Sequence, residues 1–509
     1  MMHPRTITTF SAGLYLASSV AAAPLSCQVA CSAAEIPRPV LFGAEIVSLD
    51  AVEFRNQSVA TLQGENVWLS YCGVNITYIH PGWNDSINVE IWLPLDNWNG
   101  RFQGTGGGGF QMSSGPLGLA SAVRDGYAAV RSDGGHTADS AADWALTSPG
   151  NLNYPLLQDF AAVGLSDMTI LGQAVTQSFY GEQPAYSYCN GCLTGGRQGL
   201  MLAQRYPDLY DGILAIAPAI NWDTFLVTEY WPQHVMATLG VYPSPCELGA
   251  FTMAAIAACD SLDGLEDGII SDPDSCTFDP ESIIGQPFNC SSTSEGIFTA
   301  AGAAVAKAAW TGPVNPYGKL EWYGLNKDAT LSGLVGTVAA TNTSAARGVP
   351  FPVSAEWIKW FVARDPSLVL NNITTAQFFR FLHLSRNDKM ITWHGLADQL
   401  IFPNGTRDYY ERVTEAVPDV QDFYRFFEAP GVAHCSGGPG PQPRNELQAL
   451  VDWVEKGIAP ETLLTVNATL NGVVPGPGQA LPTRNICAWP KRQRYVGGDP
   501  AAAASFTCV

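Results

Sequence analysis

The sequence has few charged residues and is especially short of positive charge. Only 14% of its 509 residues are charged, and 26 lysines and arginines stand against 46 aspartates and glutamates, for a formal net charge of −20. Because an acidic surface of this size repels phosphate backbones and anionic lipid, we expect neither nucleic acid nor a membrane as a partner. A hydrophobic fraction of 46% favours a chain that folds around a core over a disordered one.

Long hydrophobic runs are scarce as well. The run over residues 10–20 is too short for a transmembrane helix, which needs ~20 residues. It follows a basic stretch at residues 1–5 and precedes three alanines at residues 21–23, an order typical of cleaved secretory signal peptides. We therefore predict that residues 1–23 are a signal peptide and that the mature protein is secreted.

Cysteines and glycosylation motifs agree with this compartment. The chain has twelve cysteines, an even number, as expected where disulfides persist. Eight N-x-S/T sequons predict an N-glycosylated surface. The sequons begin at Asn56, Asn75, Asn84, Asn289, Asn342, Asn372, Asn404 and Asn467.

The apolar pattern predicts an α/β core. Residues 88–93 alternate and are rich in β-branched side chains, as in a strand, whereas residues 160–179 have apolar side chains at helical spacing. Residues 185–188 predict a further strand, which leads through a glycine-rich turn into a helix over residues 198–205. A strand, a sharp turn and a helix in this order form the nucleophile elbow of an α/β hydrolase.

The domain organisation follows from a change in this pattern. Residues 221–385 are irregular and rich in Ala, Gly, Thr and Trp, and 509 residues are too many for one simple core. We predict an α/β-hydrolase core made of residues 24–220 and 386–509, with residues 221–385 inserted as a lid. Pockets form preferentially between such units.

The residues expected to carry chemistry begin with a glycine run at residues 106–109. Such a run lets backbone N–H groups approach a substrate closely, as an oxyanion hole requires. The predicted elbow, residues 188–200, reads YCNGCLTGGRQGL. It resembles the G-C-S-x-G-G-R-Q-G-L elbow of the tannase/feruloyl esterase family at every position but one. The exception is the nucleophile, which is Leu193, and leucine has neither a lone pair nor a proton to give.

Two later segments extend the resemblance over nearly the whole mature chain. Residues 394–398 (HGLAD) resemble the family's H-G-x-x-D turn, and residues 430–438 (PGVAHCSGG) resemble its P-G-x-x-H-C-x-G-G loop. By this resemblance His434 is the catalytic histidine and Asp398 orients it, in the chain order of α/β hydrolases. The predicted oxyanion donors are the backbone amides of Gly108, Gly109 and Thr194.

The sequence departs from the family a second time. The family usually has an Arg-Ala-x-His turn after Asp-Phe in the helix before the elbow, whereas here Asp159 and Phe160 are followed by AAVGLS. A polar pair has become small and apolar. This change accompanies the loss of the nucleophile and predicts a reshaped pocket for an aromatic or phenolic compound.

A calcium site is also implied by resemblance. Residues 259–268 (CDSLDGLEDG) are similar to the family's lid loop C-D-x-x-D-G-x-x-D-G, in which carboxylates supply the hard oxygen ligands of Ca²⁺. The alternative is a solvated acidic turn. By resemblance the ligands are the side chains of Asp260, Asp263 and Asp267 and the carbonyls of Leu265 and Ile269.

The resemblance also implies a disulfide between Cys192 and Cys435, which would connect the elbow to the histidine loop. Cys259–Cys276 and Cys487–Cys508 are two further predicted bridges, and Cys72 is expected to pair with Cys27 or Cys31. Four cysteines stay unassigned: Cys189, Cys246, Cys290 and whichever of Cys27 and Cys31 is left over.

Three functions remain open for this carboxylic-ester-hydrolase scaffold. A repurposed enzyme would use His434 and Asp398 for isomerisation, cyclisation, dehydration or coupling of a phenolic secondary metabolite. An esterase would need an activated water or another nucleophile, for which Thr194, Cys192 and Ser436 are the neighbouring candidates. Retention of Asp398, His434 and the supporting Cys435 argues against a non-catalytic binding protein, so we rank the repurposed enzyme first.

Overall fold

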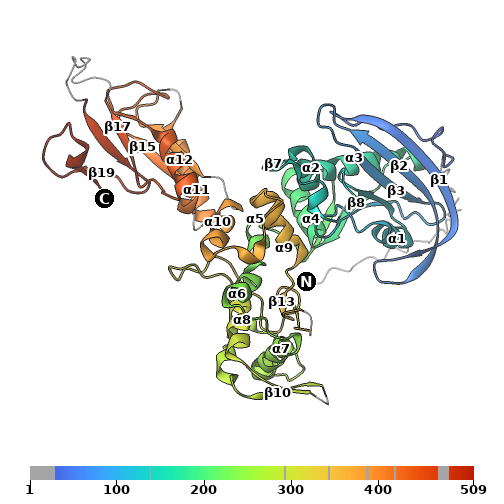
Figure 1. The fold of residues 1–509 in the computed structure, drawn as a ribbon. Coiled ribbons are helices and arrows are strands. Elements are labelled where there is room, and N and C mark those ends of the chain that lie inside the picture. The colour runs from blue at the N-terminus through green and yellow to red at the C-terminus, as the bar shows by residue number, and fades with distance from the viewer. Residues whose placement is uncertain are drawn as a thin grey trace, which may run out of the picture. The chain divides into compact units, whose positions relative to one another are not determined.

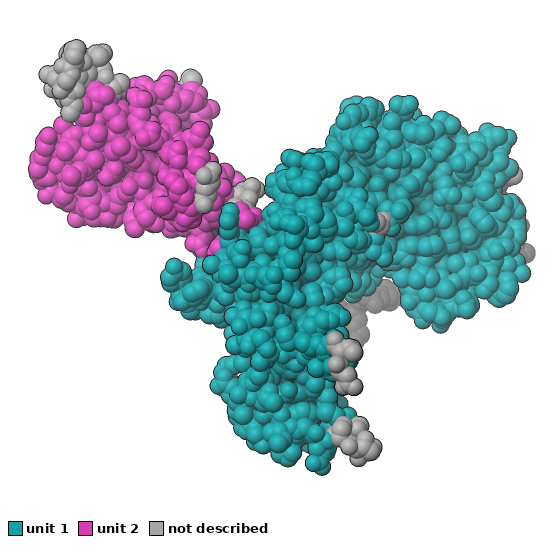
Figure 2. All heavy atoms as spheres, viewed as in Figure 1, with its two compact units in different colours: residues 1–382 teal, residues 383–509 magenta. Residues whose placement is uncertain are grey.

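The computed structural model describes residues 29–137, 139–291, 294–341, 344–385, 389–399, 401–417, 420–467 and 481–509 (Figure 1). The predicted signal peptide, Cys27 and Asn342 lie outside the described residues. The chain forms two compact units, residues 1–382 and 383–509 (Figure 2). The boundary lies close to residue 385, where the lid was predicted to end; the assignment of residues 24–220 and 386–509 to one core stays a prediction.

A seven-stranded mixed sheet organises the first unit, in the order β1-β2-β3-β5-β4-β8-β9. The pairs from β1 to β5 are antiparallel, and those among β5, β4, β8 and β9 are parallel. Its strands are β1 (Glu45–Ala60), β2 (Asn66–Ile79), β3 (Ile87–Pro94), β4 (Arg101–Thr105), β5 (Ala128–Ser132), β8 (Tyr186–Cys192) and β9 (Gly212–Ile216). The strands predicted at residues 88–93 and 185–188 are therefore present as β3 and β8.

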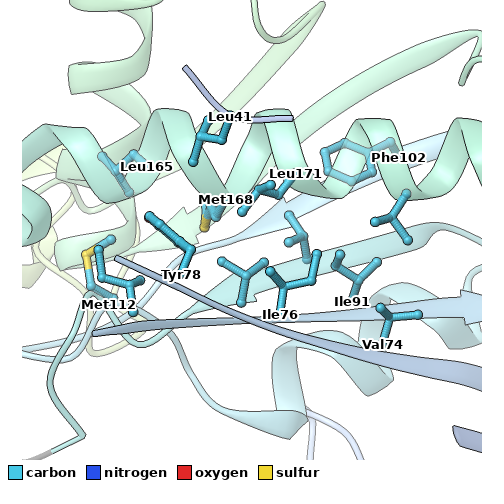
Figure 3. Packing of buried hydrophobic residues seen from close by; sticks show 14 of the residues in the cluster. Leu41, Val74, Ile76, Tyr78, Ile91, Phe102, Met112, Leu165, Met168 and Leu171 are labelled. Atoms are coloured by element: carbon cyan, nitrogen blue, oxygen red, sulfur yellow. The ribbon is translucent and has the colours of Figure 1, made fainter. Parts of the chain in front are cut away.

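Helices pack on this sheet through the apolar faces that the sequence pattern predicts. Figure 3 shows Leu165, Met168 and Leu171 of one helix beside the strand residues Ile76 and Ile91, all of them buried. Parallel neighbours such as β4 and β8 need helical crossovers, and the helices supply them. The helices of this part are α1 (Pro116–Arg124), α2 (Tyr154–Gln158), α3 (Gly164–Tyr180) and α4 (Thr194–Arg205), and a short hairpin joins β6 (Leu146–Ser148) to β7 (Asn151–Leu152).

The segment predicted to be a lid is mainly helical and belongs to the first unit except for its last residues. It has its own apolar cluster, which includes Met236, Phe251 and Val335, and it packs on the sheet core through Phe361. Its elements are α5 (Trp222–Thr228), α6 (Trp231–Leu239), α7 (Pro245–Cys259), β10 (Pro287–Ser291), β11 (Ser294–Ile297), α8 (Ala300–Thr311), β12 (Thr337–Val338), β13 (Arg347–Gly348), α9 (Pro352–Glu356) and α10 (Thr375–Ser385).

The second unit contains a parallel strand pair, β14 with β15, and an antiparallel sheet in the order β16-β17-β18. Since parallel strands end at the same edge, the turns that follow β14 and β15 meet there. The elements are β14 (Met390–Gly395), α11 (Pro403–Ala416), β15 (Tyr424–Ala429), β16 (Gln442–Pro443), α12 (Glu446–Lys456), β17 (Thr462–Val466), β18 (Thr483–Cys487), β19 (Gln493–Tyr495) and β20 (Phe506–Cys508).

Within the described residues the chain forms four disulfides: Cys31–Cys72, Cys246–Cys290, Cys259–Cys276 and Cys487–Cys508. The last two confirm predicted bridges, and the first selects Cys31 as the partner of Cys72. In the part of the chain that the structure describes, no helix is long and apolar enough to cross a membrane.

Candidate active site

The nucleophile elbow is formed in full, although its central residue is a leucine. Strand β8 ends at Cys192 and helix α4 begins at Thr194, and Leu193 between them has φ 57° and ψ −116°. A side-chain-bearing residue at positive φ is strained, and this strained turn is what raises the nucleophile above an α/β-hydrolase sheet. The glycines around it allow the turn to be tight, because a Cβ at Gly191 would lie 2.6 Å from Gly195.

Hydrogen bonds fix the glycine loop against the elbow. The Gly195 amide donates to the Gly107 carbonyl (2.8 Å), and the Gly107 amide donates to Gln198 Oε1 (3.2 Å). Gln198 Nε2 donates in turn to the Met112 carbonyl (3.0 Å). The loop therefore has one defined position relative to the start of α4, as a preorganised oxyanion hole requires.

The predicted oxyanion donors lie on this platform. Gly108 and Gly109 are half-buried in the loop, and Thr194 supplies the first amide of α4, where helix amides have no intrahelical partner. The Thr194 hydroxyl donates to the Gly109 carbonyl (2.6 Å). Since that hydroxyl helps to hold the loop, Thr194 is poorly suited to replace the missing nucleophile.

Leu193 projects its side chain beside the same loop. It is 56% exposed, and a Cβ at Gly108 would lie 3.7 Å from Leu193 Cδ1. The position where a nucleophilic oxygen would stand thus holds an apolar, chemically inert group. The backbone machinery of an acyl-transfer site is present without the atom that would attack.

A histidine–aspartate pair lies at the edge where β14 and β15 end. Asp398 follows β14 and His434 follows β15, and His434 Nδ1 lies 3.0 Å from Asp398 Oδ2. The Asp398 side chain is 3% exposed, and its other oxygen accepts the Ile401 amide (2.9 Å). An aspartate held in this way fixes the orientation and tautomer of the imidazole and leaves Nε2 for proton transfer.

Sequence reasoning did not assign a role to His394, which shares the same aspartate. His394 Nε2 lies 3.0 Å from Asp398 Oδ2, and His394 Nδ1 lies 2.8 Å from the Thr406 hydroxyl. Asp398 Oδ2 therefore lies within hydrogen-bond distance of both imidazole rings. The signal available in the sequence was the H-G-x-x-D spacing, which puts His394 at the end of β14 and Asp398 in the turn after it.

Cys189 and Cys192 of the elbow strand and Cys435 of the histidine loop form no disulfide within the described residues. Cys192 belongs to the first unit and Cys435 to the second, both are exposed, and the bridge between them stays a prediction. Cys189 is buried, and burial raises the pKa of its thiol to about 12. Because the thiolate is the nucleophilic form, Cys189 is excluded as a substitute nucleophile.

Where the family has a polar turn, this chain forms an aromatic cluster around Arg197. The guanidinium lies over the rings of Phe160 (4.8 Å) and Trp222 (5.5 Å) and donates to the carbonyls of Phe160 and Ala161. Burial lowers the pKa of Arg197 to about 10. Phe110, which ends the glycine loop, contacts both Phe160 and Trp222 edge-on or tilted. The wall behind the loop is therefore apolar and aromatic.

The predicted calcium loop is an exposed turn closed by Cys259–Cys276. Asp260 accepts the amides of Asp267, Gly268 and Ile269, and Asp263 accepts the amide of Leu265. Hydrogen bonds from Ser271 and Leu265 lower the pKa of Asp263. A donor set made of oxygen atoms alone suits Ca²⁺. In this structure, however, the carboxylates of Asp260 and Asp263 accept hydrogen bonds from loop amides, so the calcium site stays a prediction.

Comparison with known proteins decides the family. A family model described as Tannase and feruloyl esterase matches residues 72–377 and 362–509. The chain belongs to the tannase and feruloyl esterase family. Its class is therefore that of the carboxylic ester hydrolases, as the sequence motifs predicted.

Individual members of the tannase and feruloyl esterase family resemble the chain over nearly its full length. A probable feruloyl esterase of Arthroderma benhamiae is 40% identical, over 94% of this chain and 93% of that protein. The tannase of Aspergillus oryzae is 30% identical, over 89% and 87%. Among solved structures, tannin acyl hydrolase from Aspergillus niger is 27% identical, with a TM-score of 0.62 over 94% of this chain and 93% of that one.

Proposed function

We propose that this protein is a family member that has given up acyl-enzyme chemistry and uses His434 as a general acid–base on an aromatic or phenolic carbonyl compound. The observation that carries the proposal is Leu193, which occupies a fully formed elbow without any nucleophilic atom. Removing the nucleophile from such a site leaves only the oxyanion hole and the binding of the substrate to contribute to hydrolysis.

In the proposed reaction each retained group has a defined part. His434 Nε2 removes a proton from the bound substrate, while Asp398 at Nδ1 stabilises the imidazolium that forms. The amides of Gly108, Gly109 and Thr194 donate to the enolate or phenolate oxygen that develops. His434 then returns the proton to another atom of the substrate. No bond to the protein forms, and isomerisation or cyclisation of the substrate needs no co-reactant.

The family membership supports joint action of the two units, because the family model spans both of them. The aromatic cluster of Phe110, Phe160 and Trp222 supports a phenolic substrate, since ring faces and edges pack favourably on one another. We assign residues 221–385 the role of a lid over this substrate.

Ester hydrolysis by a water that His434 activates is a second candidate. The names of the relatives favour it, since they are a probable feruloyl esterase and a tannase. A water-based route would use the same dyad and the same oxyanion donors, but its rate would lack the contribution of a covalent intermediate.

One paired assay separates these candidates. Wild type, His434→Ala, Leu193→Ser and Leu193→Ser/His434→Ala are tested on methyl ferulate, methyl gallate and a nitrophenyl ester. We expect a silent wild type, and turnover in Leu193→Ser that the added His434→Ala lowers by at least ~10³-fold. Hydrolysis by wild type that His434→Ala abolishes would establish the water-based esterase and refute the first proposal.

Secretion and N-glycosylation complete the proposal. Six sequon asparagines of the described chain are exposed, namely Asn56, Asn75, Asn84, Asn289, Asn372 and Asn404. An exposed asparagine is accessible to glycan transfer, which takes place in the oxidising compartment where the disulfides form. We also propose a structural Ca²⁺ in the lid loop, because residues 259–268 resemble the calcium loop of the family.

A further inference from the structure

A cluster of three carboxylates and one imidazole is buried in the first unit, away from the elbow and from the calcium loop in the sequence. His80 and Asp85 follow strand β2, Asp159 begins the turn before α3, and Asp167 lies on α3. Their exposed fractions are 9%, 8%, 0% and 7%, respectively. Tyr78, which Figure 3 shows among the apolar side chains of the core, borders the cluster.

His80 lies between the carboxylates. Its Nδ1 is 2.6 Å from Asp85 Oδ2 and 3.8 Å from Asp159 Oδ1, and its Nε2 is 3.1 Å from Asp167 Oδ2. Ligand atoms of His80, Asp85 and Asp159 all lie within 4.8 Å of one another. Among the described residues this is the only group of three or more His, Cys, Asp or Glu side chains that meets this distance.

Asp159 is the member of the cluster whose carboxylate receives no hydrogen bond from a donor group of the described residues. Neither of its carboxylate oxygens accepts a hydrogen bond from an N–H or O–H group of the described chain, and the residue is fully buried; its neighbour Asp85 can satisfy it only by sharing a proton. Burial, followed by the charge of Asp85, raises the pKa of Asp159 to about 7. A buried carboxylate without a donor is costly, and such groups are normally paired or bound to a metal.

The cluster also has more negative than positive charge. The groups that shift the pKa of Asp159 and Asp167 are carboxylates, Tyr78 and His80, and no lysine or arginine is among them. Were all three carboxylates ionised, the net charge would be −2 even with a protonated imidazole, so without an ion the raised pKa of Asp159 leaves the cluster partly protonated near neutral pH. A divalent cation balances that charge where the described side chains supply no second cation.

We propose that Nδ1 of His80 and the carboxylates of Asp85 and Asp159 bind one first-row divalent metal ion, Zn²⁺ or Mn²⁺. A mixed imidazole and carboxylate set suits these ions, whereas Ca²⁺ prefers oxygen ligands alone. On binding, the ion replaces the proton at Nδ1 and any proton held between Asp85 and Asp159, and these protons leave to solvent.

Asp167 is placed to orient the ligand histidine. A metal-bound histidine usually donates its other ring N–H to a carboxylate, and His80 Nε2 faces Asp167 Oδ2. Tyr78 donates its hydroxyl to the same oxygen (3.0 Å), so this supporting carboxylate is itself fixed. The Asp85 carboxylate is fixed by the His80 amide, which donates to Oδ1 (2.8 Å).

The backbone at Asp159 gives the site a structural role. Asp159 begins a π-helical turn, Asp159–Val163, and such turns are frequent at functional sites. The carbonyls of Phe160 and Ala161 in this turn accept the guanidinium of Arg197, which lies on elbow helix α4. The ion therefore holds the turn that buttresses the elbow, whatever reaction the elbow supports.

Metal analysis of purified full-length protein tests the proposal. The wild type is stripped with a chelator, incubated with Zn²⁺ or Mn²⁺, desalted and analysed by mass spectrometry of the elements. We expect about one equivalent in wild type and less than a tenth of that in Asp159→Asn and in His80→Gln. Asp167→Asn should weaken binding by ~10–100-fold, as loss of an orienting carboxylate does. Asp263→Asn, in the calcium loop, should retain the full equivalent.

A second measurement covers variants that fail to fold. Anomalous diffraction from zinc-soaked wild-type crystals should give a peak between His80, Asp85 and Asp159. The proposal is overturned if wild type retains no ion in either measurement, or if the ion persists in both folded variants. It is also overturned if Asp159→Asn stabilises the protein while no metal binds, because the cluster is then held by shared protons alone.

Discussion

At the scale of single residues, Leu193 has an unfavourable backbone conformation, and its side chain buries little apolar surface. Its φ of 57° costs a leucine on the order of 1–2 kcal/mol, and more than half of its surface is exposed. A protein under selection for stability alone would place glycine there. Stability alone therefore does not explain leucine at this position; under the proposed function, its apolar side chain would contact the aromatic substrate.

This strain gives a stability prediction. Leu193→Gly should leave the free energy of unfolding unchanged or raise it by up to ~1 kcal/mol, because relief of the positive φ offsets the entropy that glycine adds to the unfolded chain. Leu193→Val should lower it by about 1–2 kcal/mol, since a β-branched residue tolerates positive φ worst. Denaturant titration measures both.

Leu200 offers a matched control. It is also exposed, but it lies inside helix α4, where Leu200→Gly should cost about 1 kcal/mol. If Leu193→Gly is as destabilising as Leu200→Gly, the elbow is not strained, and the argument from its backbone fails.

Glu229 provides a second prediction at this scale. Its Oε2 is buried without a hydrogen-bond partner among the described residues, and burial raises the pKa of the carboxyl to about 8. Between the ordinary value of about 4.5 and 8, the folded protein holds a proton that the unfolded chain releases. Stability must therefore fall as pH rises through this window, by up to ~1.4 kcal/mol per pH unit.

We expect Glu229→Gln to remove this part of the pH dependence. Its advantage in unfolding free energy over wild type should grow from pH 5 to pH 8 and then level off. Denaturant unfolding at four pH values measures the difference. Glu182→Gln, at an exposed glutamate, should follow wild type throughout, and a constant difference for Glu229→Gln would contradict the shifted pKa.

At the scale of elements, much of the candidate site was predictable because its determinants are local. The elbow requires glycines at fixed offsets from one residue, and the sequence Gly191-Cys192-Leu193-Thr194-Gly195 displays them directly. The turns after β14 and β15 carry Asp398 and His434 in short motifs. Parallel pairing of these two strands then brings the motifs together, and pairing of this kind follows from the fold class.

The buried cluster was not predictable for the opposite reason. His80 and Asp159 are far apart in the sequence, and neither stands in a metal-binding spacing. They meet because helix α3 packs on the sheet that contains β2, and Asp159 lies buried at the start of the π-helical turn before α3. Likewise the sharing of Asp398 by His394 and His434 depends on ring orientations that a motif does not specify.

The calcium loop yields a prediction for a single element. If Ca²⁺ binds there, EGTA should lower the Tm of wild type, and added Ca²⁺ should restore it. An ion at 100 times its Kd stabilises a fold by about 2.7 kcal/mol. Thermal unfolding of wild type and Asp263→Asn measures the effect, which the variant should lack. No response in wild type would identify the loop as a solvated acidic turn.

At the scale of the whole molecule, covalent connections decide which parts of the chain stay together on unfolding. Each of the four disulfides lies within one unit and closes a loop of moderate length. Closing such loops reduces the entropy of the unfolded chain. The predicted Cys192–Cys435 bridge would be different, because it would join the two units and close a loop of more than 200 residues.

We expect that bridge to form in the secreted protein. A non-reducing peptide map by mass spectrometry should contain a linked pair of peptides that carry Cys192 and Cys435, and this pair should separate on reduction. The same map reads glycans at the exposed sequons. Modification of both thiols by iodoacetamide without prior reduction would show that the bridge is absent.

The acidity of the molecule predicts that it does not bind polyanions, but it could not predict the fold, because net charge carries little information about topology. The change in composition predicted where a lid segment ends, near residue 385, but it did not predict a second compact unit after residue 382 or the helices within the irregular segment. Alanine-rich helices such as α8 lack the contrast between apolar and polar faces on which sequence reading depends.

The strained turn at Leu193 also has a historical meaning. Some serine codons differ from a leucine codon by one nucleotide, so a single mutation can exchange these two residues in either direction. A backbone that still holds positive φ at that residue keeps the return path short, since no other part of the turn would need to change. Under the proposed function, this retained turn makes ester hydrolysis an activity that a single substitution at residue 193 would restore.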